Sequence, residues 1–373
     1  MTTRITATEA QQAQALRQAV TLDEYQTRVA QALTSVFDDD HTEEQAIDVD
    51  AARLVVLSDH HKGARDGADD FRGCERAYAA ALAYYLEDGF RLFVLGDVEE
   101  LWESTAKHVL AAYPDILELE GQFHGDDRYE RFWGNHDLQW SQPGEVARHL
   151  HRFFPGLTVR EAMKLRVLRE GEALGVLFLA HGHQGTLTSD RWAWFSRPAV
   201  RYVWGPLQRR LNMRSTQPSR NFELRQRHDS AMYSWARSHP AKPVLIAGHT
   251  HRPVFWTSQA PPKESEKDLA AQLKALRASG QASADELGKL RSRLEFVRAE
   301  RREKGPTPVV IDPPCYFNTG CCSFGDGDVT GIEIANGDIR LVRWPNDEDK
   351  PLPKLLVEAD LGEVLERVAA ASA

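Results

Sequence analysis

The sequence has few cysteines and no long apolar run. Its four cysteines, in 373 residues, show no paired CxxC spacing, which argues against a zinc site built on thiolates. Reduced, buried thiols are expected, with a strained vicinal disulfide between Cys321 and Cys322 as the alternative. No apolar stretch is long enough to span a bilayer, and Met1 to Val20 contain no hydrophobic leader segment. These absences predict a cytoplasmic protein.

The sequence also lacks an excess of basic residues. Its formal net charge of −9 argues against a generic nucleic-acid binder, although a local basic site remains open. An apolar fraction of 42% is sufficient for a substantial core. The length suits one large domain or two smaller ones, and no internal repeat is present.

The residue pattern changes several times along the chain. Alternating strand and helix signals predict a layered α/β core. The predicted regions are an N-terminal helical segment over 1–48, a catalytic domain over 49–345 and a C-terminal tail and helix over 346–373. Two helical insertions are predicted inside the domain, a cap over 186–240 and a hairpin over 258–307. The C-terminal helix is predicted to span Leu355 to Ala370.

Half of the fourteen histidines lie in five short polar segments. Each segment directly follows an apolar run typical of a β-strand. The segments are Asp59-His60-His61, Gly96-Asp97-Val98-Glu99-Glu100, Gly134-Asn135-His136-Asp137, His181-Gly182-His183 and Gly248-His249-Thr250-His251. Because α/β folds bind ligands at the carboxyl ends of their strands, these segments are expected to meet at one edge of the sheet.

The residue types in these segments suit a metal centre. Asp59 and His61 are two residues apart, so both side chains can lie on one side of an extended strand end. Oxygen and imidazole ligands without thiolate favour Mn²⁺, with Fe or Zn²⁺ as alternatives. Asp97 could bridge two cations, and Asn135 adds a neutral amide oxygen. The remaining candidate ligands, His181, His249 and His251, are sufficient to complete two sites. A pair of metals clamps a phosphoryl group and activates water for in-line attack on phosphorus.

The five segments, in this order, resemble those of the calcineurin-like metallophosphoesterase superfamily. The resemblance covers D-x-H, G-D-x-x-E, G-N-H-D, H-G-H and G-H-T-H, from about Arg53 to Pro253. It implies an α/β fold with a two-sheet sandwich flanked by helices. It also implies that two divalent ions share Asp97. The first ion would take Asp59, His61 and His251, and the second Asn135, His181 and His249.

His136 is the candidate general acid, because it follows Asn135 and would point at the substrate. A protonated imidazole there could protonate the leaving group. The resemblance implies that Glu100 orients His136, although the family often has Asp at this position. Asn135 and Arg252 are candidate substrate contacts. His60 and His183 flank ligands and could be either structural or functional, and Asp137 is expected to anchor its loop.

Residues 191 to 228 contain nine arginines and one acid, with tryptophans and other aromatics interleaved. Three interpretations remain open: arginines paired with the acidic surface, a clamp for phosphate or diphosphate oxygens, and a patch that lies peripherally on a membrane. Arg197 and Arg201 are the candidate substrate contacts in this cap. The last two interpretations are compatible if the substrate is nucleotide- or lipid-linked.

The chain is also similar to the UDP-2,3-diacylglucosamine pyrophosphatase branch of the superfamily. The second segment continues to Leu101-Trp102, as in that branch, and a basic helical lid stands between the fourth and fifth segments. The branch differs in having Arg at the position of His136 and Asp at the position of His183. The resemblance therefore indicates kinship to the branch, with membership left open.

Together these observations predict a dinuclear metal-dependent phosphoesterase that cleaves a phosphodiester or a diphosphate. Within the same superfamily the alternatives are a phosphomonoesterase and a nuclease. A nuclease would be expected to have a wider basic surface and a steep dependence on salt. A non-catalytic scaffold that docks through the 258–307 hairpin is the alternative outside the enzymes.

Overall fold

The computed structural model describes most of the chain. The described residues are 24–67, 69–186, 222–255, 266–279, 312–323, 327–346 and 351–371. Most of the predicted Arg-rich cap, residues 187–221, and most of the 258–307 hairpin lie outside them. Of the hairpin, residues 266–279 are described, as helix α9 (Glu266–Ser279).

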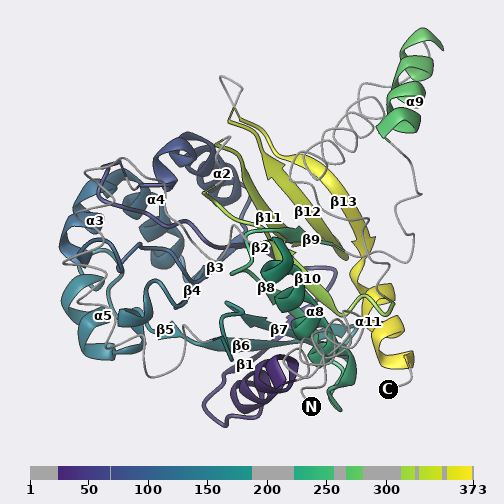
Figure 1. Ribbon diagram of the computed structural model, residues 1–373, viewed down its shortest axis with the longest axis horizontal. Helices are drawn as coiled ribbons and strands as arrows, with labels where there is room; N and C mark the ends of the chain where they lie inside the picture. The colour runs from purple at the N-terminus through teal and green to yellow at the C-terminus, as the bar shows by residue number, and fades with distance from the viewer. Residues whose placement is uncertain are drawn as a thin grey trace, which may run out of the picture.

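A seven-stranded sheet carries the first three ligand segments (Figure 1). Its order is β13-β12-β11-β2-β3-β4-β5. The strands are β2 (Arg53–Leu57), β3 (Arg91–Leu95), β4 (Tyr129–Phe132), β5 (Val159–Arg160), β11 (Val329–Ala335), β12 (Asp338–Trp344) and β13 (Lys354–Asp360). Strands β2 to β5 are parallel, and β11 to β13 add to them in antiparallel fashion. Strands β11 and β12 are joined by a tight turn at Asn336 and Gly337, which both have positive φ.

A six-stranded mixed sheet carries the other two ligand segments, in the order β1-β6-β7-β8-β10-β9. Its strands are β1 (Glu44–Asp48), β6 (Ala162–Arg169), β7 (Glu172–Ala180), β8 (Val244–Ala247), β9 (Pro253–Val254) and β10 (Tyr316–Thr319). Strand β7 pairs in parallel with β8, which places both of its following loops at the same edge.

The two sheets pack face to face, with helices on their outer faces. Alternation along β2 shows this, since Val56 lies in the core shared by the sheets, whereas Val55 and Leu57 face helices. The helices over the seven-stranded sheet are α2 (Glu75–Glu87), α3 (Ala106–Ala112), α4 (Pro114–Gly125) and α5 (Pro143–His149). The predicted two-sheet α/β sandwich flanked by helices is confirmed.

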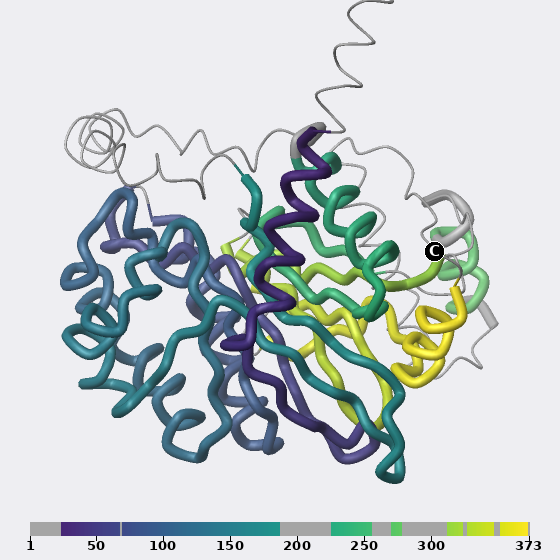
Figure 2. Tube along the Cα trace, turned by 90° about the horizontal axis from the view of Figure 1, so that it is seen from below, coloured from purple at the N-terminus to yellow at the C-terminus, as the bar shows by residue number. Residues whose placement is uncertain are grey.

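Residues 24–37 form a helix that covers the six-stranded sheet together with α8 (Phe222–Ser238). Figure 2 shows the two running side by side, in purple and green, and Trp235 Nε1 donates to Thr34 Oγ1 at 3.0 Å. Val29, Leu33 and Phe37, which recur at helical spacing on this helix, are buried. Among the described helices, none is long and apolar enough to cross a membrane.

Two sequence predictions were wrong about local structure. Residues 44–48 form strand β1 instead of extending the N-terminal helical segment, because β1 pairs in parallel with β6. The C-terminal helix does not begin at Leu355, because residues 354–360 form β13 beside β12. Helix α11 (Leu361–Ala370) begins after Asp360, whose side chain accepts a hydrogen bond from the backbone N–H of Glu363.

Candidate metal centre

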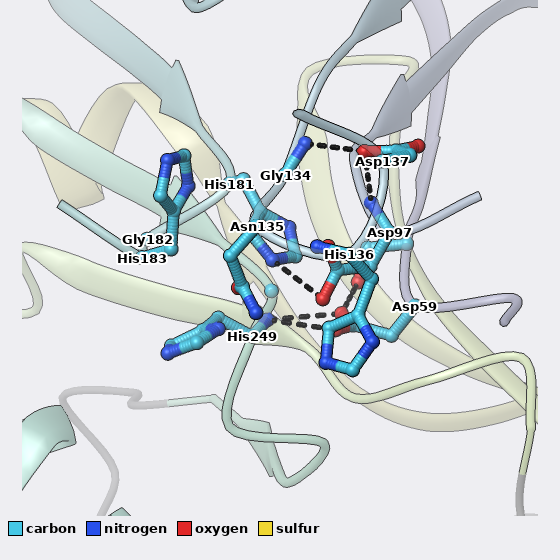
Figure 3. Close-up of polar contacts among 12 residues, drawn as sticks. Asp59, Asp97, Gly134, Asn135, His136, Asp137, His181, Gly182, His183 and His249 are labelled. Carbon is cyan, nitrogen blue, oxygen red and sulfur yellow. Dashed lines mark hydrogen bonds and ion pairs between the residues drawn. The ribbon is translucent and has the colours of Figure 1, made fainter. Parts of the chain in front are cut away.

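The five predicted segments converge at one edge of the sandwich (Figure 3). Three follow β2, β3 and β4 in one sheet, and two follow β7 and β8 in the other. Contacts between the sheets hold them together. The backbone N–H of His249 donates to Asp59 Oδ2 at 2.9 Å, and His181 Nε2 lies 3.2 Å from Asp97 Oδ2.

The backbone at five of the seven candidate ligands is left-handed, not extended. The φ angles are 55° at Asp59, 49° at His61, 51° at Asp97, 69° at His249 and 55° at His251. The expectation that Asp59 and His61 share one side of an extended strand end is therefore wrong, although both side chains do reach the site. Left-handed non-glycine residues are energetically costly and tend to cluster at functional sites.

Two glycines make the close approach of the loops sterically feasible. A Cβ at Gly134 would collide with Asp97 Oδ1, and a Cβ at Gly248 would collide with Ser58 Oγ and Asp59 Oδ2. The glycines of the third and fifth segments are therefore required by packing against ligand carboxylates.

Asp59, His61 and His251 form the first cluster of candidate ligands. His251 Nε2 lies 3.2 Å from Asp59 Oδ1 and 3.0 Å from His61 Nε2. Asp59 and His61 are buried, and the His251 side chain is 16% exposed. Two imidazole nitrogens this close share one proton, and a cation bound there would displace it.

The second cluster consists of Asp97, His181 and His249. His181 Nδ1 donates to the Leu95 carbonyl at 2.6 Å, which leaves Nε2 as the nitrogen that faces Asp97. A histidine held in this way by a backbone carbonyl is oriented for metal binding. Asp97 also belongs to a third cluster with His61 and His136, so its carboxylate lies between the two ligand groups.

Glu100 connects a candidate ligand to the candidate acid. Its Oε2 accepts hydrogen bonds from His136 Nδ1 at 2.7 Å and from His61 Nδ1 at 3.2 Å. Burial raises the pKa of the Glu100 carboxyl, but the charge and hydrogen bond of His136 and those of His61 lower it to about 2. Glu100 therefore remains an anion that fixes both imidazoles, which was predicted only for His136.

Asp137 anchors its loop, as expected. Its carboxylate accepts from the backbone N–H groups of Gly134 at 2.7 Å, Val98 at 2.8 Å and Asp97 at 3.3 Å. These bonds join the second and third ligand loops, so Asp137 sets the spacing between Asp97 and Asn135.

The remaining predicted residues have varied surroundings. His60 is buried with its ring edge against Tyr78, at a centroid distance of 4.5 Å, which supports the structural interpretation. His183 is buried beside Trp133 and His181, with centroid distances of 5.1 and 5.4 Å. Arg252 is half-buried directly after His251. Arg197 and Arg201 lie outside the described residues.

His228 was missed by the sequence analysis, since it lies outside the five segments. Its Nε2 donates to the Gly182 carbonyl at 2.5 Å, and its Nδ1 therefore accepts from the Tyr25 hydroxyl at 2.6 Å. Burial lowers the pKa of His228 to about 4, so the imidazole is neutral at pH 7. This chain of bonds ties the fourth ligand loop to α8 and to the N-terminal helix.

A fully buried group of charges beneath the loops was also missed. Lys62 Nζ lies 2.8 Å from Glu120 Oε1 and 4.0 Å from Glu99 Oε1, and Arg131 pairs with Glu99. Trp140 Nε1 donates to Glu99 Oε2 at 2.9 Å. Lys62 and Glu99 follow β2 and β3, Arg131 lies on β4 with Trp140 in the turn beyond it, and Glu120 lies on α4. The network therefore joins the segments that carry the first three ligand loops.

We expect Lys62→Met to reduce the free energy of unfolding by about 3–5 kcal/mol, because it removes the cation closest to the buried Glu120 carboxylate. Arg53→Met is the control, since Arg53 and Asp88 form an exposed pair for which about 0–1 kcal/mol is expected. Urea titration measures both. A Lys62→Met loss as small as that of Arg53→Met would contradict the role of the network, and Lys62→Met/Glu120→Gln should recover part of the loss.

The donor set fits divalent cations. Asn135 Oδ1 is buried without a hydrogen-bond partner among the described residues, as expected of an oxygen reserved for a cation. The other candidate ligands are carboxylate oxygens and imidazole nitrogens, and no thiolate belongs to the three clusters found among the described residues. The described cysteines are free and buried, as predicted.

Metal binding should depend on pH. Burial lowers the pKa of His61, but its hydrogen bond to Glu100 and the nearby carboxylates raise it to about 10. Burial likewise lowers the pKa of His181, and the charges of Asp97 and Asp59 raise it to about 9. Both imidazoles therefore hold a proton at pH 7 in the metal-free protein, and a bound cation must displace it.

We therefore expect the apparent affinity for Mn²⁺ to rise from pH 6 to pH 9, by about tenfold per pH unit for each proton released. Calorimetry of Mn²⁺ binding in buffers of different ionisation enthalpy counts these protons directly. An affinity that does not change with pH, or binding without proton release, would show that His61 and His181 are not ligands.

Comparisons with known proteins give little further information about the function of this site. No family model matches the chain, and no curated protein matches its sequence. Among solved structures, one match is the crystal structure of the calcineurin-like phosphoesterase YfkN from Bacillus subtilis, with 8% sequence identity and a TM-score of 0.31. The match covers 85% of this chain and 95% of that chain. A TM-score this low carries no argument for a shared function. Any inference about function must therefore come from the five ligand loops and their geometry.

Proposed function

We propose that this chain is a dinuclear metal-dependent phosphoesterase that hydrolyses a phosphodiester or diphosphate bond. One observation carries the proposal: two clusters of ligands lie on either side of the Asp97 carboxylate, beside a histidine that is hydrogen-bonded to Glu100. Asp59, His61, Asp97 and His251 would hold one cation, and Asp97, Asn135, His181 and His249 the other. When bound, such a pair polarises a phosphoryl oxygen and provides activated water at neutral pH.

The protein's own contribution is to orient groups and to supply a proton. Glu100 accepts the Nδ1 proton of His136, so the opposite ring nitrogen is the one that can face a leaving oxygen. Burial lowers the pKa of His136, but Glu100 and Asp97 outweigh it and raise the pKa above its usual value. The raised pKa favours the protonated imidazole, which can donate its proton as the phosphorus–oxygen bond breaks.

The test uses purified protein stripped by a chelator and then reconstituted with Mn²⁺, Zn²⁺ or Fe²⁺. We expect hydrolysis of an aryl phosphodiester only after reconstitution. Three further substrates separate the interpretations. An aryl phosphomonoester tests for a phosphomonoesterase, a nucleotide-linked diphosphate for a pyrophosphatase, and single-stranded DNA for a nuclease. Undiminished turnover of the phosphodiester after chelation would refute the proposal.

The substrate class and location are proposed from the sequence of the cap. Its arginines suit a second phosphate, and its tryptophans suit a lipid or nucleotide group or the surface of a membrane. We infer a cytoplasmic enzyme that acts on a nucleotide- or lipid-linked diphosphate, with Arg252 as a further phosphate contact from the core.

Replacing Arg197, Arg201 and Arg209 by Gln should raise KM for a nucleotide-linked diphosphate by at least about tenfold, since each charge-assisted hydrogen bond contributes about 1.5–3 kcal/mol. KM for a small aryl phosphodiester should not change. The control removes three exposed arginines outside the cap, Arg53, Arg148 and Arg166, whose side chains are 47%, 68% and 53% exposed. Unchanged KM values with reduced binding to anionic liposomes would favour the membrane patch over the clamp.

A further inference from the structure

Trp102 lies directly against the candidate acid. Its indole is stacked on the His136 imidazole, with ring centroids 4.1 Å apart and an angle of 17° between the planes. The side chain is half-buried, in the turn that follows the second ligand segment. A stack this close and this parallel fixes the plane of the imidazole.

Two hydrogen bonds connect Trp102 to the same site. The indole Nε1 donates to the backbone carbonyl of Asn135 at 2.8 Å, and the backbone N–H of Trp102 donates to Glu100 Oε1 at 3.2 Å. One residue therefore contacts the acid, the carboxylate that orients the acid, and the peptide of a candidate metal ligand.

The hydrogen bond from His136 to Glu100 is not sufficient to orient the imidazole. A single bond restrains Nδ1, but small changes in the side-chain torsions of His136 can still tilt and rotate the ring. The indole face opposes this rotation, because any tilt of the imidazole would bring it into the indole. Glu100 and Trp102 therefore together restrain the direction of the opposite nitrogen.

We propose that Trp102 is a positioning residue for the reaction proposed above, on which this inference rests. Its indole face holds the plane of His136 so that the proton-donating nitrogen faces the leaving group. Its Nε1–H holds the Asn135 carbonyl, and with it the orientation in which the Asn135 amide reaches the second cation.

Two substitutions separate these roles. Trp102→Leu removes both the flat ring and the N–H donor. It should lower kcat by about 10–100-fold for aryl phosphodiesters with poor leaving groups and much less for those with acidic leaving groups. Trp102→Phe keeps a flat ring but loses the donor. It should retain the wild-type dependence on the leaving group and weaken binding of the second Mn²⁺ equivalent by about tenfold, measured calorimetrically without substrate.

A double-mutant cycle tests whether Trp102 acts through His136. In a His136→Asn background, Trp102→Leu should cause little further loss of kcat, because the ring that it orients is already gone. Tyr84→Leu is the control, since Tyr84 is a 38% exposed aromatic residue that contacts the rings of Tyr85 and Trp344 away from the site. If the Trp102→Leu variant does not fold, Trp102→Met is used in its place.

The outcomes distinguish this inference from the proposed function. A wild-type protein without metal-dependent hydrolysis would overturn both. With an active wild type, equal losses across the leaving-group series or additive losses in the cycle would overturn the stacking role alone. Unchanged Mn²⁺ affinity in Trp102→Phe would overturn the role of the Asn135 contact.

Discussion

Asp97→Asn should abolish metal-dependent turnover while the protein remains folded. The carboxylate belongs to two of the three ligand clusters, and it is 1% exposed, so an amide there removes a charge shared by both cation sites. Changing residues that merely orient metal ligands typically lowers activity 10–100-fold, and we expect the loss of a shared ligand to exceed about 10³-fold.

The substitution suits the backbone. Asp97 has a φ of 51°, and Asn is among the few side chains that tolerate this left-handed conformation. Its Oδ1 can still accept the hydrogen bond from the backbone N–H of His136, which is 2.8 Å long in the wild type. The loss of activity should therefore come from the missing charge and not from a collapsed loop.

Calorimetric titration with Mn²⁺ and a thermal melt accompany the kinetic measurement. Glu333→Gln is the control, since Glu333 is a buried carboxylate that is hydrogen-bonded to Tyr85 outside the metal centre. It should retain both metal equivalents and normal turnover. If Asp97→Asn binds two equivalents and turns over normally, Asp97 is not the shared ligand.

His136→Asn should lower kcat by about 10²–10⁴-fold on substrates with poor leaving groups, because Asn cannot deliver a proton. The loss should shrink as the leaving group becomes more acidic, since a stable leaving anion needs no proton in the transition state. Both metal equivalents should remain, because Nδ1 of His136 is hydrogen-bonded to Glu100 and the residue is proposed to face substrate.

The metal titration matters here because His136 also lies in a cluster with His61 and Asp97 that could hold a cation. If His136→Asn loses one equivalent of metal, the residue is a ligand and the acid must be another group. A uniform loss across the leaving-group series, with both metals retained, would also contradict the role of acid. His151→Asn is a suitable control, since His151 is bonded to the Leu157 carbonyl away from the site.

Much of the site could be predicted from local sequence. Each ligand loop follows a short apolar run, and the structure has a strand at each of the five runs. The glycines beside the ligands were present in the motifs, although the atoms they accommodate, such as Asp59 Oδ2 beside Gly248, come from a distant part of the chain. A local motif can therefore indicate a ligand, whereas the need for glycine beside that ligand comes from a contact between the two sheets.

The predictions of secondary structure failed where it depends on pairing with a distant strand, which local periodicity does not show. Residues 44–48 and 354–360 form strands because β6 and β12 offer edges for them to pair with, and pairing of this kind overrides local propensity. The extended geometry expected at Asp59 and His61 also failed, since backbone hydrogen bonds to the Gly96 and Asp97 carbonyls hold the loop in its left-handed conformation.

The sequence by itself determined which residue types are available for metal chemistry and the order in which they follow the strands, because these depend on the residues and on their neighbours along the chain. Only the tertiary structure decided that Glu100 fixes both His61 and His136, that Trp102 covers the acid, and that Lys62, Glu99, Glu120 and Arg131 join two ligand loops to β4 and α4. These arrangements depend on distances between residues tens of positions apart, and such distances are set by how the sheets and helices pack.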